Sequence, residues 1–297
     1  MSVRRWKQII TVSVLSLILI LAVLTIVFGV KYGNVKSDYE DLEEMVEVDE
    51  TTKGYDLSKI SKYFQSAQPL EYQTKYSKLY VDNDFTYEEH DKVCYLTFDD
   101  GPSTENTEKI LKVLKKYNVK ATFFVVNKSG DDMTELYKKI VDEGHTIAVH
   151  TASHNYEKIY SSVKAYLKDF NRCSKRIEEA TGVKPEIFRF PGGSVNSYNY
   201  ELCQPLIAEM LRRGYTYYDW NVSSGDASGT ILSEKQIYKN VVNNVAESGE
   251  SIVLMHDSNE KDSTVEALDD IIETLTERGY TFDKLDKTVK PIIFSYL

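Results

Sequence analysis

Carboxylate and imidazole side chains stand at the ends of apolar runs in this 297-residue chain. Asp99 and Asp100 end one run, and His150 ends another, with His154 four residues further on. Two imidazoles at this spacing can share one face of a turn and bind one metal ion together with a carboxylate. Such a set leaves positions on a divalent cation open for water and substrate. The other aspartate is then free to act as a general base.

Further apolar runs end in Arg189, in Asp219 followed by Trp220, and in His256. A histidine apart from the metal ligands suits a general acid, so the set as a whole suits attack of activated water on an amide or ester carbonyl. Phosphoryl transfer is disfavoured because the sequence has no Gly-rich phosphate loop and no second cluster of carboxylates. A zincin protease is excluded because Thr151 replaces the glutamate that its motif requires.

Each of these residues also has an ordinary structural interpretation. The two aspartates precede a Gly-Pro turn signal, and Trp220 is of a type more often found in a core than in a substrate wall. Arg189 could form a surface ion pair, and His256 could be a hydrogen-bonded core histidine. Their joint placement favours a functional site, because ligands bind at the carboxyl ends of parallel strands.

The polar residues follow short β-branched runs that alternate with amphipathic stretches. The runs cover residues 93–98, 121–126, 146–149, 186–190, 216–220 and 252–255. The helical patterns cover residues 107–117, 133–143, 162–181, 201–213, 234–247 and 264–278. Buried strands that feed one-faced helices predict parallel βαβ units, and therefore an α/β domain or barrel.

The chain resembles the polysaccharide deacetylase family, also called carbohydrate esterase family four. The resemblance rests on five ordered motifs: TFDDGP at 97–102, HTASH at 150–154, RFPGG at 189–193, DW at 219–220 and LMH at 254–256. TFFV at 122–125 is similar to the family's second strand. The resemblance covers about residues 92–285 and implies a distorted (β/α)7 barrel, here a catalytic domain at 92–297, that removes acetyl groups from N-acetylated sugars.

The resemblance also implies catalytic roles. Asp99 would be the general base and His256 the acid that protonates the leaving amine. Arg189 would pair with Asp99 and hold it ionised and oriented, and Asp219 would tune His256. The implied ligands of one divalent metal ion are Asp100, His150 and His154. Zn²⁺ is the default ion for this ligand set, and Co²⁺, Ni²⁺ and Mn²⁺ are alternatives.

Three residues would face the substrate. Gly192 would offer its backbone N–H to the oxyanion, and Trp220 and Leu254 would line the acetyl pocket. The sequence departs from the family's commonest form in two places. Gly192 stands where many members have tyrosine, which leaves the sugar subsite undefined, and Thr216 stands where an aspartate is often seen.

Residues 9–30 form a run of 22 uncharged, mostly apolar residues. A helix of this length spans about 33 Å, enough to cross a bilayer core. A secretory signal peptide is disfavoured because no small-x-small cleavage site follows. Basic residues precede the run, so the positive-inside rule predicts a cytoplasmic tail at 1–8 and an extracellular stalk and packing arm at 31–91. The predicted protein is a single-pass protein of the cell membrane with an extracellular catalytic domain.

Composition limits the remaining possibilities. A net charge of −10 without clustered cations argues against binding to nucleic acid. Cys94 lies in an apolar run and is predicted to be a core residue. A disulfide between Cys173 and Cys203 is left open, since sequence cannot establish its geometry.

The predicted reaction is metal-dependent deacetylation of an extracellular glycan, foremost the N-acetylglucosamine of peptidoglycan. N-acetylmuramic acid is the open alternative for the sugar. Two other functions stay open at this stage: an O-acetyl esterase acting on a surface polysaccharide, and a non-catalytic glycan-binding relative.

Overall fold

The structure is a computed structural model that describes residues 70–295. The predicted transmembrane segment at 9–30 and the stalk up to residue 69 lie outside these residues. Within the described part, no helix is long and apolar enough to cross a membrane.

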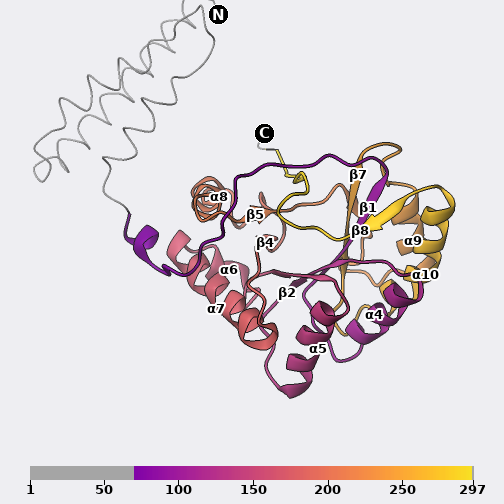
Figure 1. Ribbon diagram of the computed structural model, residues 1–297, viewed down its shortest axis with the longest axis horizontal. Coiled ribbons are helices and arrows are strands. Elements are labelled where there is room, and N and C mark those ends of the chain that lie inside the picture. The colour runs from indigo at the N-terminus through magenta and orange to yellow at the C-terminus, as the bar shows by residue number, and fades with distance from the viewer. Residues whose placement is uncertain (1–69, 296–297) are drawn as a thin grey trace, which may run out of the picture. The chain divides into compact units, whose positions relative to one another are not determined.

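Eight strands form one sheet in which every pairing is parallel (Figure 1). They are β1 (Val93–Asp99), β2 (Thr122–Val125), β3 (Thr146–Val149), β4 (Ile187–Phe188), β5 (Thr216–Tyr217), β6 (Val222–Ser223), β7 (Glu250–His256) and β8 (Thr281–Asp283). The order is β5-β4-β3-β2-β1-β7-β6, and β8 pairs with β1. No hydrogen-bonded ladder joins β5 to β6 among the described residues, so the sheet curls like part of a barrel without closing.

The helices surround the strands, with α6, α7 and α8 on one side of the view and α9 and α10 on the other (Figure 1). They are η1 (Glu71–Thr74), α4 (Thr107–Lys116), α5 (Asp131–Asp142), α6 (Tyr156–Ile159), α7 (Val163–Thr181), α8 (Cys203–Arg212), α9 (Glu234–Val242) and α10 (Asp262–Glu277). Local signals set the limits of α7, because the Ser162 side chain accepts a hydrogen bond from Ala165 N and Gly182 follows with φ 73°.

The predicted α/β fold is confirmed, and the differences lie in the shortest strands. β6 and β8 were not predicted, because two or three residues are too few to show a periodic pattern. The predicted runs at 186–190 and 216–220 contain strands of only two residues. Pairing continues for one more residue in each case, since Arg189 N donates to Val149 O and Tyr218 N donates to Phe188 O.

Side chains of β1 alternate between two apolar cores. Cys94, Leu96 and Phe98 belong to the large core between the sheet and the helices. Val93 and Tyr95 belong to a smaller core inside the curl of the sheet. Because successive strand residues point to opposite faces, this alternation carries Asp99 to the inner side.

The same alternation holds in the other strands that end in site residues. In β7, Val253 belongs to the outer core and Ile252 to the inner core, so the period of two places Leu254 and His256 on the inner side. In β4, Ile187 belongs to the inner core, which places Arg189 there as well. The carboxyl end of the curled sheet therefore collects polar side chains from separate strands.

Residues 70–91 pack on the domain through a buried arginine. Arg213 pairs with Glu209 at 2.7 Å, and its guanidinium also donates to four backbone carbonyls, those of Tyr72, Lys75, Tyr76 and Leu79. Gly214 follows, and a Cβ there would lie 1.9 Å from the carbonyl oxygen of Val81. This close approach requires glycine.

The C-terminal segment fills the inside of the curl. Leu285 and Val289 are buried in the inner core. The Tyr218 hydroxyl oxygen lies 2.6 Å from each of the carbonyl oxygens of Asp286 and Val289, so the two carbonyls share its one hydrogen. Asp219 N donates to Ile292 O at 2.8 Å, so the segment also contacts the chain between β5 and β6.

All three cysteines are buried and free. Cys94 is a core residue, as predicted. Cys173 and Cys203 do not form the disulfide that the sequence left open. Their thiols instead donate to the carbonyls of Val125 and Tyr200.

Candidate active site

Asp100, His150 and His154 form a cluster whose candidate ligand atoms all lie within 4.8 Å of one another. Asp100 Oδ1 lies 3.2 Å from His154 Nε2 and 3.8 Å from His150 Nε2. This oxygen is buried and has no hydrogen-bond partner in the described part of the chain, although a buried carboxylate oxygen normally has one. Two imidazole nitrogens and a carboxylate oxygen are ligands that suit a divalent transition metal, so the three residues fit the predicted ion.

The backbone of the Asp100, His150 and His154 cluster is held in an uncommon conformation. Asp100 has φ 75°, Thr151 has φ 67° and His154 has φ 49°. A left-handed backbone is unfavourable for residues other than glycine, and such positions concentrate at functional sites.

His150 is oriented by its second ring nitrogen. Nδ1 lies 3.0 Å from the carbonyl oxygen of Arg189. Because a carbonyl only accepts, Nδ1 carries the proton and Nε2 keeps its lone pair for a metal ion. Burial, reinforced by the charge of His154, lowers the pKa of His150 to about 3. The neutral ring is the form that binds a metal.

The buried residue Asp169 on α7 holds the loop between the two histidines. Its Oδ1 accepts hydrogen bonds from Ala152 N at 2.7 Å and from Ser153 N at 2.8 Å. Sequence reasoning missed this residue. The available signal was an acid between Tyr166 and Phe170, on the side of the helix that packs against the core.

Asp99 forms a buried salt bridge with Arg189, whose Nη1 lies 2.8 Å from Asp99 Oδ1. The guanidinium also donates to Thr97 Oγ1 at 2.7 Å and to the carbonyl oxygens of Tyr218 and Asp219 at 3.0 and 3.2 Å. These bonds use most of its donors, which orients Arg189 firmly. The other carboxylate oxygen, Asp99 Oδ2, lies 3.6 Å from His150 Nε2 and therefore faces the metal cluster.

Two opposing effects act on the pKa of Asp99. Burial raises its pKa, and the Arg189 guanidinium opposes this shift without cancelling it. The salt bridge orients Asp99 and favours its ionised form, while desolvation acts in the opposite direction.

His256 is paired with Asp226, which sequence reasoning also missed. His256 Nδ1 lies 2.8 Å from Asp226 Oδ1, and the second oxygen, Oδ2, accepts from His256 N at 2.8 Å and from Thr264 Oγ1 at 2.9 Å. Burial alone would lower the pKa of His256, but the hydrogen bond and charge of Asp226 outweigh it and raise the pKa. A raised pKa suits a histidine to act as a general acid.

The prediction that Asp219 tunes His256 is wrong. The Asp219 carboxylate accepts hydrogen bonds from Ser194 N at 2.8 Å, from the Ser194 hydroxyl and from Phe294 N at 2.7 Å. These bonds tie its side chain to the turn after β4 and to the C-terminal segment. Asp226 comes from the turn after β6, the strand next to β7, and this adjacency brings it to His256.

The predicted substrate residues lie around the same rim. Gly192 is exposed with φ 75°. The Trp220 ring packs edge-on against Phe294 at 4.8 Å, with the Arg189 guanidinium 5.7 Å from its centroid. Leu254 is buried on the inner side of β7. Their contacts with a substrate stay predictions.

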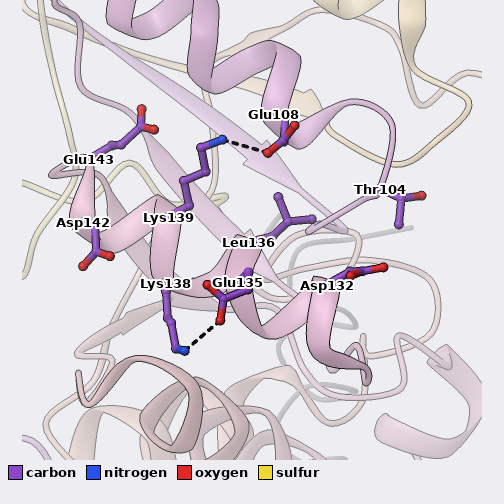
Figure 2. Close-up of a pocket in the computed structure, with 9 residues that line it drawn as sticks. All are labelled: Thr104, Glu108, Asp132, Glu135, Leu136, Lys138, Lys139, Asp142 and Glu143. Carbon is purple, nitrogen blue, oxygen red and sulfur yellow. Dashed lines mark hydrogen bonds and ion pairs between the residues drawn. The ribbon is translucent and has the colours of Figure 1, made fainter.

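A separate groove lies between α4 and α5 (Figure 2). It is lined by Thr104, Glu108, Asp132, Glu135, Leu136, Lys138, Lys139, Asp142 and Glu143. Lys139 pairs with Glu108 at 2.8 Å and Lys138 with Glu135 at 2.9 Å, as Figure 2 shows. The groove contains no histidine and none of the cluster residues, so the predicted chemistry lies elsewhere.

Comparisons with known proteins agree with the geometry. The family model of polysaccharide deacetylases matches residues 86–207. A putative polysaccharide deacetylase, YheN of Bacillus subtilis, is 34% identical over 68% of this chain and 70% of its own length. A peptidoglycan-N-acetylglucosamine deacetylase of Bacillus cereus is 32% identical over 65% of this chain and 68% of its own length.

The fold has a similar counterpart among solved structures. The catalytic domain of a peptidoglycan N-acetylglucosamine deacetylase from Eubacterium rectale superposes with a TM-score of 0.67 and 38% identity, covering 72% of this chain and 97% of that domain. The chain belongs to the polysaccharide deacetylase family, and its peptidoglycan deacetylase relatives are hydrolases acting on amide bonds. The prediction of an enzyme of this class is thereby confirmed.

Proposed function

We propose that this protein removes acetyl groups from the N-acetylglucosamine units of peptidoglycan, with Zn²⁺ held by Asp100, His150 and His154. The observation that carries the proposal is the convergence of three sets on one rim: this ligand cluster, the Asp99–Arg189 pair and the His256–Asp226 pair. The activities named for the Bacillus cereus and Eubacterium rectale relatives support this choice of sugar.

The two pairs have complementary tasks in this reaction. A divalent cation, when bound, polarises the acetyl carbonyl and lowers the pKa of water. Asp99, oriented by Arg189, accepts the proton of the attacking water. His256, whose pKa is raised by the carboxylate of Asp226, donates a proton to the amine as the C–N bond breaks. The backbone N–H of Gly192 is offered to the oxyanion.

We further propose that the enzyme works outside the cell, anchored by a membrane span at 9–30 and joined to it by residues 31–91. The basic residues before the uncharged run support this orientation. A tethered enzyme reaches wall glycan close to its own membrane, and each amine that it frees adds a positive charge to the wall.

The test measures acetate release by the full-length protein from N-acetylglucosamine oligomers and from purified peptidoglycan, with Zn²⁺ and with a chelator. We expect release that the chelator abolishes and that Asp99→Asn reduces strongly. Mass spectrometry of the digested peptidoglycan then identifies the deacetylated sugar. No metal-dependent release from any N-acetylated glycan would refute the proposal, and release from O-acetylated polymers alone would establish an esterase instead.

A further inference from the structure

The exposed turn at Gly192 leaves room that a side chain from another element occupies. A Cβ placed on Gly192 would lie 2.8 Å from Tyr156 Cε1 and 3.0 Å from the Tyr156 hydroxyl oxygen. The φ of 75° at Gly192 independently disfavours any other residue there. The Tyr156 ring therefore stands where a side chain of residue 192 would begin.

Tyr156 is placed directly beside the metal cluster. It is the first residue of α6, two positions after His154, and the two rings meet edge-on with centroids 5.3 Å apart. Asn155 caps the helix by accepting a hydrogen bond from Lys158 N. The position of this aromatic ring is thus tied to that of a candidate metal ligand.

A second tyrosine extends the aromatic surface outward. The Tyr198 ring lies 5.0 Å from the Tyr156 ring, and Tyr198 is 58% exposed. A ligand that covers the apolar face of this ring would be stabilised, because burying apolar surface lowers the free energy. Tyr156 itself is half-buried, so the two rings form a continuous aromatic surface that runs from the metal cluster to solvent.

The turn that carries Gly192 is well supported. Tyr160 donates to Pro191 O at 2.7 Å, and Asn196 Nδ2 donates to Pro191 O at 3.2 Å and to Gly193 O at 3.1 Å. Asn196 Oδ1 in turn accepts from Tyr198 N at 2.9 Å. These bonds connect the backbone of Tyr198 to the same turn, so the aromatic surface and the Gly192 N–H are held together.

We infer that Tyr156 and Tyr198 form the platform on which a sugar ring of the glycan lies while its acetyl group reaches the Asp100, His150 and His154 cluster. The apolar C–H face of a pyranose packs on an aromatic face, and binding sites combine such surfaces with a few polar groups. The inference rests on the proposed function, since it names the sugar subsite of that same site. The contact between Tyr156 and His154 favours the glycan over a protein partner.

The experiment measures binding separately from turnover. In full-length protein carrying Asp99→Asn, calorimetry gives the Kd for an N-acetylglucosamine pentamer. We expect Tyr198→Ala and Tyr156→Ala each to weaken binding by about tenfold, the effect of one lost aromatic contact. Tyr156→Phe, which retains the ring, keeps the Kd. Tyr200→Ala is the matched control, because Tyr200 is 63% exposed on the same segment.

Metal content and melting temperature are measured for every variant. If Tyr156→Ala loses its metal, Tyr198→Ala carries the test, since it does not contact His154 in the described contacts. An unchanged Kd in Tyr198→Ala, an equal loss in Tyr200→Ala, or a loss in Tyr156→Phe as large as in Tyr156→Ala would overturn the inference. Normal pentamer binding, with no metal-dependent acetate release from any N-acetylated glycan by the unmodified protein, would instead refute the proposed function and leave the platform in place.

Discussion

Asp226→Asn provides the sharpest test of the catalytic arrangement. It distinguishes Asp226 from Asp219, the residue that the sequence indicated as the partner of His256. The Asp226 carboxylate is 2.8 Å from His256 Nδ1, with side-chain exposures of 3% and 12%. Such a buried pair is little screened by solvent. Asparagine can still accept from Nδ1–H, so the substitution removes chiefly the charge.

The sign of the expected effect follows from the pKa shift. Asp226 raises the pKa of His256, and a general acid loses activity as the pH rises through its pKa. Without the carboxylate the pKa falls, so the alkaline limb of the activity profile moves to lower pH. A hydrogen bond to a charged group contributes about 1.5–3 kcal/mol, which corresponds to a shift of about 1–2 pH units.

The assay is the pH dependence of kcat/KM for acetate release, compared among the unmodified protein, Asp226→Asn and Asp219→Asn. Asp226→Asn is also expected to lower the Tm, because its amide would face the backbone N–H of His256. The position of the limb, rather than the rate, is therefore the readout. Asp219→Asn should leave the limb in place, since its carboxylate contacts Ser194 and Phe294. A shifted limb in Asp219→Asn with an unshifted one in Asp226→Asn would refute the reasoning.

Three further predictions concern the metal loop, the arm and the thiols. Asp169→Ala, which removes the acceptor of two loop N–H groups, should weaken Zn²⁺ binding by about 10–100-fold in a competition titration with a chelator; unchanged affinity would show that the loop needs no such support. Arg213→Ala removes four hydrogen bonds to the segment before β1 and one of the two arginines that pair with buried Glu209, while the pair with Arg212 remains, so it should cost about 1.5–3 kcal/mol in denaturant unfolding and open residues 70–81 to limited proteolysis; Lys138→Ala, whose ion pair with Glu135 is exposed, is the control. Because the cysteines are free, a reductant should not change the Tm, and the unfolded protein should titrate with three thiols; a Tm that falls on reduction would contradict the structure.

The sequence predicted the site residues that follow long, apolar strands. Asp99 and His256 end seven-residue strands, and their motifs are contiguous, so both the strand and the residue after it could be recognised. Asp226 could not be recognised in this way. It lies beside Gly225 in a polar turn after a strand of two residues, and only the pairing of β6 with β7 brings it to His256.

Asp169 and Tyr156 were missed for a related reason. Neither residue belongs to a motif, and each contacts motif residues only because the chain folds: Asp169 binds the loop at Ala152 and Ser153, and Tyr156 contacts His154. An acid on a helix and a tyrosine at a helix start are common features, and their significance depends on which loop packs against them. Likewise the alternation along β1 predicts that Asp99 lies on the same face of the strand as Tyr95. It does not predict that this face is the inner one, because the inner core is completed by Leu285 and Val289 from the far end of the chain.

The hydrogen bonds from Arg213 to the residues before β1 have a mechanical consequence. Its guanidinium holds four carbonyls of the segment from Tyr72 to Leu79, so the polypeptide enters the domain at a defined attachment point beside the end of α8. Tension applied at residue 70 therefore acts on the exposed Lys164–Glu71 ion pair and on this buried arginine. Both contacts hold residues that precede β1, the strand that ends in Asp99, along the chain.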